Sequence, residues 1–338
     1  MKEIGQRRPS STRPVLVSTL AMMTMVVGSV PLRSAGAQLS AGLWQADSML
    51  ALGRVAAAES LYYAASSARP RDAVARAALG RYLAARGALR IGAVLLEEAR
   101  LFGGDTSGIA RSLAPIYCSL GDYRALATLP ASPLSAPELK RVRWLVSHPP
   151  VLEFPDSTAT VPYKPLVDGS GVGTASLGLG ERRVDALIDP RVSGVVLRGR
   201  AARRRSGLRV FGDDSTGAMA ILPELHVGDV TLSNVPVRLD ADSSRDTRRA
   251  RQTVIVGLDV LRRLAPTFDP LTKTITLRRS GQIAPTTVGT RAPMLLDEQG
   301  LRFVIEGRWE TAASPKTAKL LGAQRWTLDA KHGALVLQ

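Results

Sequence analysis

The fold of the C-terminal half is decided by the stretch VDALIDPRVSGVVL, residues 184–197. An apolar run, Ala186–Ile188, leads to one carboxylate, Asp189, and a second apolar run, Val195–Leu197, follows a turn that contains Gly194. Short apolar runs bounded by turn residues are typical of buried strands. The stretch therefore predicts two strands joined by a polar loop that carries Asp189.

Turn signals around this stretch predict β-hairpins. Gly180-Glu181 separates Thr174–Leu179 from Arg183–Ile188, and Gly228-Asp229 marks a second hairpin farther along. A glycine beside a carboxylate or amide residue is the usual composition of such tight turns because one of the turn residues needs a positive φ. The stretch at 184–197 is thus expected to lie within a sheet of short strands.

Beyond the second hairpin, Val254–Val256 is predicted to be a buried strand because it is apolar throughout. Gly257 ends the strand, and Leu258–Leu264 has the pattern of a short helix. A last hairpin is predicted over Thr267–Leu277. From Val151 onward the chain is therefore β-rich.

The N-terminal half has a different pattern. Gly53, Gly87 and Gly121 are spaced by 34 residues, and each lies between two segments with helical apolar periodicity. Glycine suits the tight turn between two paired helices. The pattern resembles tetratricopeptide repeats over Ala41–Pro130, and it predicts antiparallel helix pairs.

One more helix is predicted after the repeats. Ser135 and Glu138 have the spacing of a capping box, in which each side chain bonds the backbone of the other. The helix is expected to run to Ser147. Pro149 and Pro150 then mark the boundary to the β-rich part.

The order of β elements over Val161–Ser280 resembles the retropepsin-like aspartic protease domain. Ile255-Val256-Gly257 matches the apolar-apolar-Gly element that packs behind the catalytic loop of that family, and Asn234–Val237 is similar to the segment that follows the flap. The expected fold class is therefore α + β multidomain. It combines N-terminal α-helical tetratricopeptide-like repeats with a C-terminal all-β acid-protease barrel.

The first residues predict export. A basic segment, residues 2–13, precedes the apolar run Val15–Val30 and the small-residue site Ala35-Gly36-Ala37, as in a secretory signal peptide. The run has 16 residues, fewer than the roughly 20 that span a bilayer. No membrane span is expected after removal of the signal, and the predicted location is periplasmic or extracellular.

These patterns divide the chain into four parts. The predicted domains are a signal peptide at 1–37, a helical domain at 38–148, a retropepsin-like domain at 151–283 and a C-terminal β extension at 284–338. The extension repeats some features of the preceding domain. Its alternative interpretation is a shortened second lobe.

The resemblance implies peptide hydrolysis by a pair of carboxylates that share a proton, each in an Asp-Thr-Gly loop. Here the aligned residues are Asp189, Pro190 and Arg191, so only the carboxylate is kept. Pro190 has no hydroxyl and no N–H to brace the loop, and Arg191 would favour the ionised carboxylate. The predicted catalytic residue is Asp189. Its partner would be Glu306 in the same chain, or a second Asp189 in a homodimer formed through the β domain.

Two functions follow from these residues. One is an exported aspartic-type endopeptidase whose degenerate motif predicts weak activity or none. The alternative is a non-catalytic scaffold, a pseudoenzyme, that binds a peptide or protein through its helical repeats and a basic cleft.

The predicted partners follow from charge. The formal net charge is +16, and removal of residues 1–37 leaves a chain that is still strongly basic, which suits an acidic peptide or protein ligand. Arg191, Arg203, Arg204 and Arg205 are the predicted substrate-binding residues because guanidinium groups hold carboxylates well. Aromatic residues make up only 4% of the chain, too few for a base-stacking platform, which argues against nucleic acid. The three isolated histidines and single cysteine predict neither a metal site nor a cofactor.

Overall fold

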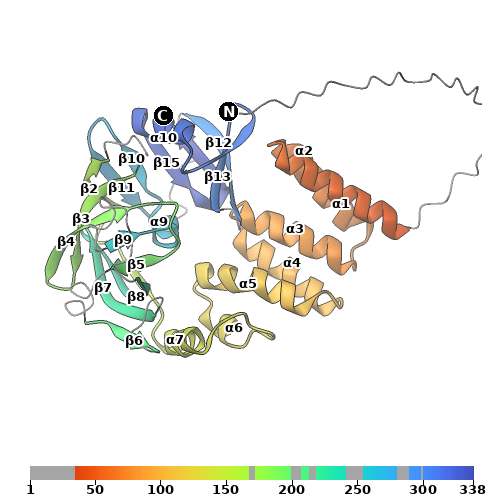
Figure 1. Cartoon of the computed structure of the whole chain (residues 1–338), viewed down its shortest axis with the longest axis horizontal. Coiled ribbons are helices and arrows are strands. Elements are labelled where there is room, and N and C mark those ends of the chain that lie inside the picture. The colour runs from red at the N-terminus through yellow and green to blue at the C-terminus, as the bar shows by residue number, and fades with distance from the viewer. Residues whose placement is uncertain are drawn as a thin grey trace, which may run out of the picture.

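The computed structural model describes residues 35–166, 172–198, 207–212, 218–240, 254–279, 289–297 and 300–338. An N-terminal group of helices lies on one side of the molecule and a β-barrel region on the other (Figure 1). The strand β12 (Thr290–Asp297) lies beside the helix α3 (Ala73–Ala85). No helix in the described part is long and apolar enough to cross a bilayer.

The helical part consists of consecutive helices joined by short turns. Its elements are α1 (Ala35–Ala51), α2 (Val55–Ala68), α3 (Ala73–Ala85), α4 (Leu89–Leu101), α5 (Thr106–Leu120), α6 (Tyr123–Ala127) and α7 (Ala136–Ser147). Gly53, Gly87 and Gly121 each fall between two helices and have φ values of 74°, 92° and 72°. Glycine is favoured at these positions because left-handed backbone is unfavourable for residues with a Cβ. The predicted helix breaks are confirmed, whereas the tetratricopeptide assignment stays a prediction.

The predicted capping box is present at the start of α7. The Ser135 hydroxyl accepts from the Glu138 backbone N–H, and the Glu138 carboxylate accepts from the Ser135 backbone N–H at 2.8 Å. The helix ends at Ser147, as the sequence predicts. The first strand begins at Val151.

The β-barrel region contains the predicted hairpins and several longer strands. Its first elements are β1 (Val151–Glu153), β2 (Thr158–Pro165), β3 (Gly173–Leu179), β4 (Arg182–Ile188), β5 (Val195–Arg198), β6 (Arg209–Phe211), β7 (Met219–Val227), β8 (Val230–Asp240), β9 (Val254–Val256), α9 (Leu258–Leu264), β10 (Thr267–Asp269) and β11 (Thr274–Arg278). The C-terminal unit is β12 (Thr290–Asp297), β13 (Gly300–Ile305), β14 (Arg308–Thr311), α10 (Pro315–Ala323), β15 (Trp326–Asp329), η2 (Ala330–His332) and β16 (Ala334–Leu337). Gly180 and Gly228 lie in the β3–β4 and β7–β8 turns with positive φ, as predicted.

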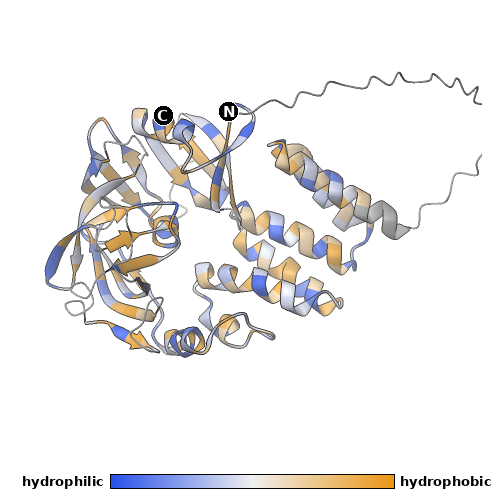
Figure 2. Cartoon of the chain, viewed as in Figure 1, coloured by the Kyte–Doolittle hydropathy of each residue, from blue (hydrophilic) through white to orange (hydrophobic). Residues whose placement is uncertain are grey.

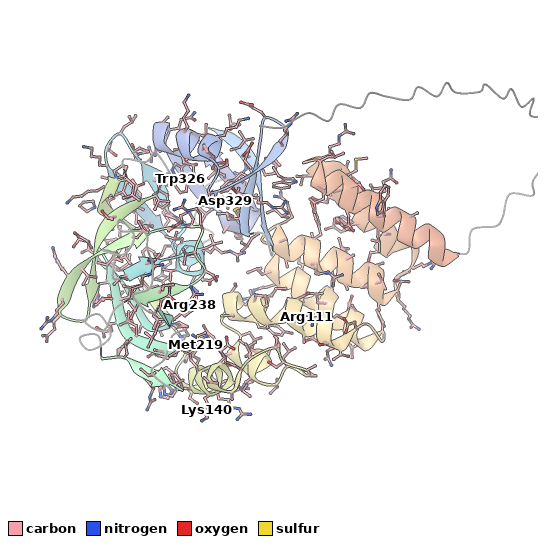
Figure 3. All side chains as sticks on the ribbon, viewed as in Figure 1. Arg111, Lys140, Met219, Arg238, Trp326 and Asp329 are labelled. Atoms are coloured by element: carbon pink, nitrogen blue, oxygen red, sulfur yellow. The ribbon has the colours of Figure 1, made fainter. Side chains whose placement is uncertain are left out.

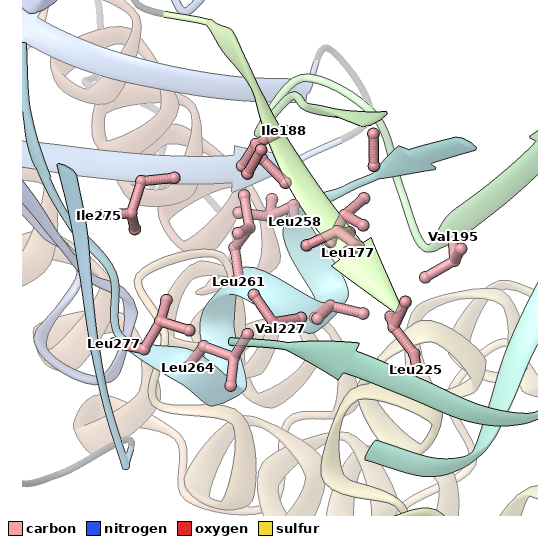
Figure 4. Close-up of a cluster of buried hydrophobic side chains, with 14 of the residues drawn as sticks. Leu177, Ile188, Val195, Leu225, Val227, Leu258, Leu261, Leu264, Ile275 and Leu277 are labelled. Atoms are coloured by element: carbon pink, nitrogen blue, oxygen red, sulfur yellow. The ribbon is translucent and has the colours of Figure 1, made fainter. Parts of the chain in front are cut away.

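The short strand β9 lies between β4 and β5 in the sheet. It pairs in parallel with β4 and antiparallel with β5, so the two strands that flank Asp189 meet on either side of it. Ile188, Val195, Val256 and Leu258 join one large core cluster, part of which is shown in Figure 4. Val196 and Ile255 point to the opposite face and pack in a smaller cluster. The predicted core residues are all buried, but they are divided between two faces.

Apolar residues line both the helices and the strands (Figure 2). The helical part has its own two buried clusters, and one of them includes Ile221 of β7. Trp144 of α7 packs against Phe211 of β6, with ring centroids 6.4 Å apart. Apolar packing therefore joins α7 to the edge of the β region.

A second contact joins the helical turns to the C-terminal unit. The Arg86 guanidinium donates to the carbonyl oxygens of Met294 and Gly333, the latter at 2.7 Å. A Cβ at Gly87 would lie 2.1 Å from the carbonyl oxygen of Ala330, and one at Gly333 would lie 2.1 Å from that of Arg86. Two facing glycines thus allow backbone to pack directly on backbone.

We expect Gly87→Ala to cost clearly more stability than Gly103→Ala. Both glycines have left-handed backbone, with φ of 92° and 84°, and that strain alone costs about 1–2 kcal/mol. Only Gly87 faces another backbone, since nothing lies within 4 Å of a Cβ at Gly103. Overpacking should add about 1–3 kcal/mol at Gly87. Urea unfolding of the two variants measures the difference, and equal losses would contradict the docking of the two turns.

Candidate functional site

Asp189 directly follows β4, in the loop that leads to β5. Its backbone N–H donates to the carbonyl oxygen of Val256 at 3.0 Å. The loop is held from the other side as well, because the Gly257 N–H donates to Gly194 at 2.8 Å and the Leu258 N–H donates to Val192 at 2.7 Å. Asp189 and Gly257 are therefore neighbours, as the sequence pattern predicts.

Gly257 is required by this close approach. A Cβ there would lie 2.2 Å from the carbonyl oxygen of Val192 and 2.5 Å from that of Gly194, and both contacts are to backbone. The φ of Gly257 is −104°, which any residue can adopt. Glycine is therefore needed at position 257 because there is no room for a Cβ, and not because of its backbone conformation.

The Asp189 side chain forms a bidentate ion pair with Arg191. The residue is only 2% exposed. Arg191 Nε lies 2.7 Å from Oδ1 and Nη2 lies 2.8 Å from Oδ2, and the Arg191 backbone N–H also donates to Oδ1 at 3.0 Å. Both carboxylate oxygens therefore accept charge-assisted or backbone hydrogen bonds from the same loop.

Glu306, the predicted partner, lies elsewhere. It occupies the turn between β13 and β14, with φ of 51°, and its exposed side chain forms an ion pair with Lys316. Among the described residues, none of the contacts of Asp189 or Glu306 joins the two side chains. The carboxylate of Asp189 is paired with Arg191 and that of Glu306 with Lys316, so these two groups are not a carboxylate pair in the structure.

The predicted substrate-binding arginines have separate positions. The Arg191 guanidinium forms an ion pair with Asp189. Arg203, Arg204 and Arg205 lie outside the described residues. Of the arginines described on either side of them, Arg198 lies 3.7 Å from a carboxylate oxygen of Asp240, and Arg209 lies over the Trp144 ring.

The histidines are not grouped. His332 bonds the buried carboxylate of Asp329 at 2.8 Å, and Arg291 contacts the same carboxylate at 2.6 Å. In the described ranges no three His, Cys, Asp or Glu side chains are placed to hold a metal ion. Asp329 therefore belongs to a local ion-pair cluster at the turn that docks on Arg86.

A cavity in the helical part was not anticipated from the sequence. It has a volume of about 700 Å³ and lies between α1, α3 and the end of α2, with Leu295 of β12 at its edge. Trp44 and Val74 line it and are 73% and 62% exposed, so the cavity opens to solvent. Its size is in the range of ligand pockets. The sequence alone offers only a tryptophan, Trp44, in a segment of helical periodicity, and its exposure is known only from the structure.

Two carboxylates and two guanidinium groups line this cavity, so its formal charges balance. The Asp47 carboxylate accepts from the Tyr62 hydroxyl, and Asp72 accepts from the Ala75 N–H at 2.9 Å as the cap of α3. Burial and then the bond to Asp47 raise the pKa of Tyr62, which keeps its phenol a donor. Arg69 and Arg81 also line the cavity, and among the described residues they form no ion pair. Both carboxylates already accept hydrogen bonds from the chain, whereas the two guanidinium groups have donors left for a ligand.

No protein-family model and no curated protein matches the chain. Among solved structures, it is similar to a retropepsin-like aspartic protease from Rickettsia conorii, with 11% identity and a TM-score of 0.26. The match covers 38% of this chain and 93% of that chain. The molecule thus has an N-terminal helical region, a C-terminal β-barrel region and a distant structural neighbour among the retropepsin-like proteases.

Proposed function

We propose that this chain is a non-catalytic relative of the retropepsin-like aspartic proteases that acts by binding a peptide or protein. The single observation that carries the proposal is the bidentate ion pair between Asp189 and Arg191. The resemblance of the loop and of Ile255-Val256-Gly257 supports the ancestry. The ion pair supports the view that Asp189 does not take part in peptide hydrolysis.

Aspartic-protease chemistry needs a carboxyl group that exchanges a proton with water and with a second carboxyl. A guanidinium stays protonated and donates only, so it offers no such exchange. Arg191 donates hydrogen bonds to both carboxylate oxygens of Asp189. Breaking this ion pair would leave the buried Asp189 carboxylate without a compensating charge. Asp189 is then a structural residue of its loop.

The proposal includes export to the periplasm or the cell exterior, which the basic and apolar pattern of residues 2–37 supports. It also includes tetratricopeptide-like repeats, supported by helix breaks at Gly53, Gly87 and Gly121. The ligand would be an acidic peptide or protein. Arg203, Arg204 and Arg205 remain proposed contacts in the β domain.

The cavity of the helical part offers a place for such a ligand. Exposed Trp44 and Val74 supply apolar surface, and Arg69 and Arg81 supply guanidinium groups that form no ion pair among the described residues. Carboxylates pair well with guanidinium forks. A peptide with acidic and apolar side chains matches this lining.

If Asp189 is structural, Arg191→Ala should destabilise the protein by about 3 kcal/mol, because it leaves a buried carboxylate unpaired. Asp189→Asn added to Arg191→Ala removes that charge and keeps an acceptor for the loop N–H. The double variant should therefore recover more than half of the loss. Thermal and urea unfolding measure both, and a double variant no more stable than Arg191→Ala would contradict the structural role.

Peptidase activity tests the proposal directly. The purified mature protein should show no pepstatin-sensitive cleavage of a broad peptide library at acidic pH, with pepsin as the positive control. Asp189→Ala should leave the result unchanged. Cleavage that disappears in Asp189→Ala, yet persists in the matched variant Asp185→Ala on the exposed face of β4, would restore the enzyme interpretation.

Binding tests the cavity. Fluorescence anisotropy with labelled peptides rich in Glu and Leu should show binding that Arg81→Ala or Arg69→Ala weakens by about tenfold, the loss expected for one charge-assisted hydrogen bond. Arg90→Ala, on the exposed face of α4 and outside the cavity, should have little effect. Equal weakening by all three variants would indicate attraction by net charge alone.

A further inference from the structure

The contact between β10 and β15 has the form of a two-fold contact. Thr267 lies opposite Thr327 in antiparallel register, and Phe268 lies opposite Trp326. The two threonine hydroxyls are 2.8 Å apart and buried, and the two rings stack with centroids 4.0 Å apart. Figure 3 labels Trp326 and Asp329 in the unit that makes this contact.

The two strands also begin a repeated sequence. TFDPLTKTITL at 267–277 and TLDAKHGALVL at 327–337 align without a gap, so equivalent residues are 60 positions apart. Asp269 and Asp329 both accept backbone N–H groups of the following turn. Lys273 and Gly333, equivalent in this alignment, have φ of 55° and 56°. A helix precedes each copy, α9 or α10.

The sequence repeat and the β10–β15 pairing are related by symmetry. Thr267 pairs with Thr327, which is its own equivalent. Two copies of one strand related by a two-fold axis pair in this manner, with the axis through the self-equivalent residue. The internal repeat is therefore arranged as two identical chains would be in a symmetric dimer.

The equivalence extends through the neighbouring strands. Ile275 pairs with Val161 of β2, and its equivalent Leu335 pairs with Ala292 of β12. Two residues farther on, Tyr163 pairs with Ala175 of β3, and Met294 pairs with Phe303 of β13. Each of these eight residues is buried. The unit β12–β13 thus corresponds to β2–β3 in pairing and in the face it buries.

One more step reaches the position of Asp189. Gly173 of β3 pairs with Ile188, the residue before Asp189. In the C-terminal unit, the equivalent of Gly173 is Leu301, whose carbonyl accepts from the Ala312 N–H at 3.0 Å. Ile188 and Ala312 are both buried. The residue equivalent to Asp189 is therefore Ala313.

No strand separates Ala313 from the next helix of the C-terminal unit. Ser314 is already the N-cap of α10, whereas in the first unit β5, β6, β7 and β8 lie between Asp189 and β9. The second unit consequently has neither the carboxylate nor the strands that frame it.

We propose that residues 290–337 are a reduced second copy of the β2–β4 and α9–β11 framework, placed within the chain where a second chain would otherwise pair. The edge of β10 is then paired with β15 of the same chain and not with a second copy. The mature protein is a monomer with one Asp189 and Ala313 in the matching position. This proposal replaces the homodimer expectation, and it holds whether or not the cavity of the helical part binds a ligand.

Disulfide cross-linking of the full mature chain tests this arrangement, with Cys118→Ser as background. Thr267→Cys combined with Thr327→Cys should form a bond within one chain under mild oxidation, because the two hydroxyls are 2.8 Å apart. Thr267→Cys alone should stay monomeric on a non-reducing gel. Thr272→Cys, exposed in the β10–β11 turn, serves with Thr327→Cys as the control for random collision and should not cross-link.

The outcomes separate the two arrangements. A dimer cross-linked through Thr267→Cys alone would show that β10 pairs with a second copy, and it would overturn the proposal. The double variant failing to cross-link while folded by circular dichroism would overturn it as well. Light scattering of the unmodified protein is independent of these variants and should give the mass of one chain at all concentrations. A concentration-dependent dimer mass that the Thr267→Cys cross-link captures counts against it.

Discussion

The β region depends on one close approach between backbones. Gly257 lies so near the carbonyl oxygens of Val192 and Gly194 that no side chain fits between them. Hydrogen bonds from Gly257 and Leu258 close this contact, and they fix where β5 begins and where α9 starts. Because β9 also lies between β4 and β5, the loop of Asp189 cannot move without separating three strands. The ion pair of Asp189 is thus presented by a rigid frame.

A similar use of glycine joins the helical part to the C-terminal unit. Gly87 faces Ala330, and Gly53 faces Gly307 with 3.0 Å between its ideal Cβ and the carbonyl oxygen. Trp309 also donates its indole N–H to the carbonyl of Leu50. Two of the repeated turn glycines therefore have a second role, since they lie in the interface with β14 and η2. The spacing of the glycines follows from the length of a helix pair. Their small size is needed because the turns that contain Gly53 and Gly87 pack against the C-terminal unit.

Local features were predictable from the sequence, and long-range ones were not. The capping box at Ser135, the turns at Gly180 and Gly228 and the break at Gly257 each follow from residues close in the chain. Glu306 does follow a strand, β13, but a tight turn leads from it into β14, and the helix comes only after β14, which the local pattern did not reveal. The pairing of Thr267 with Thr327 spans 60 residues, and the cavity depends on the angle between helices. Neither quantity is encoded in a local pattern.

If residues 290–337 are a reduced second copy, as proposed, the loop of Asp189 is compatible with a stable fold for a physical reason. In a symmetric pair of catalytic loops, each carboxylate depends on its counterpart for the shared proton. Here the counterpart position is Ala313, so Asp189 would be a buried charge without a partner. Arg191 supplies the missing partner from two residues away, and its guanidinium matches both carboxylate oxygens. In the proposed ancestry, loss of the second carboxylate and gain of the arginine are therefore physically linked. An arginine at this position is costly in a working site and stabilising in a site that has only one carboxylate.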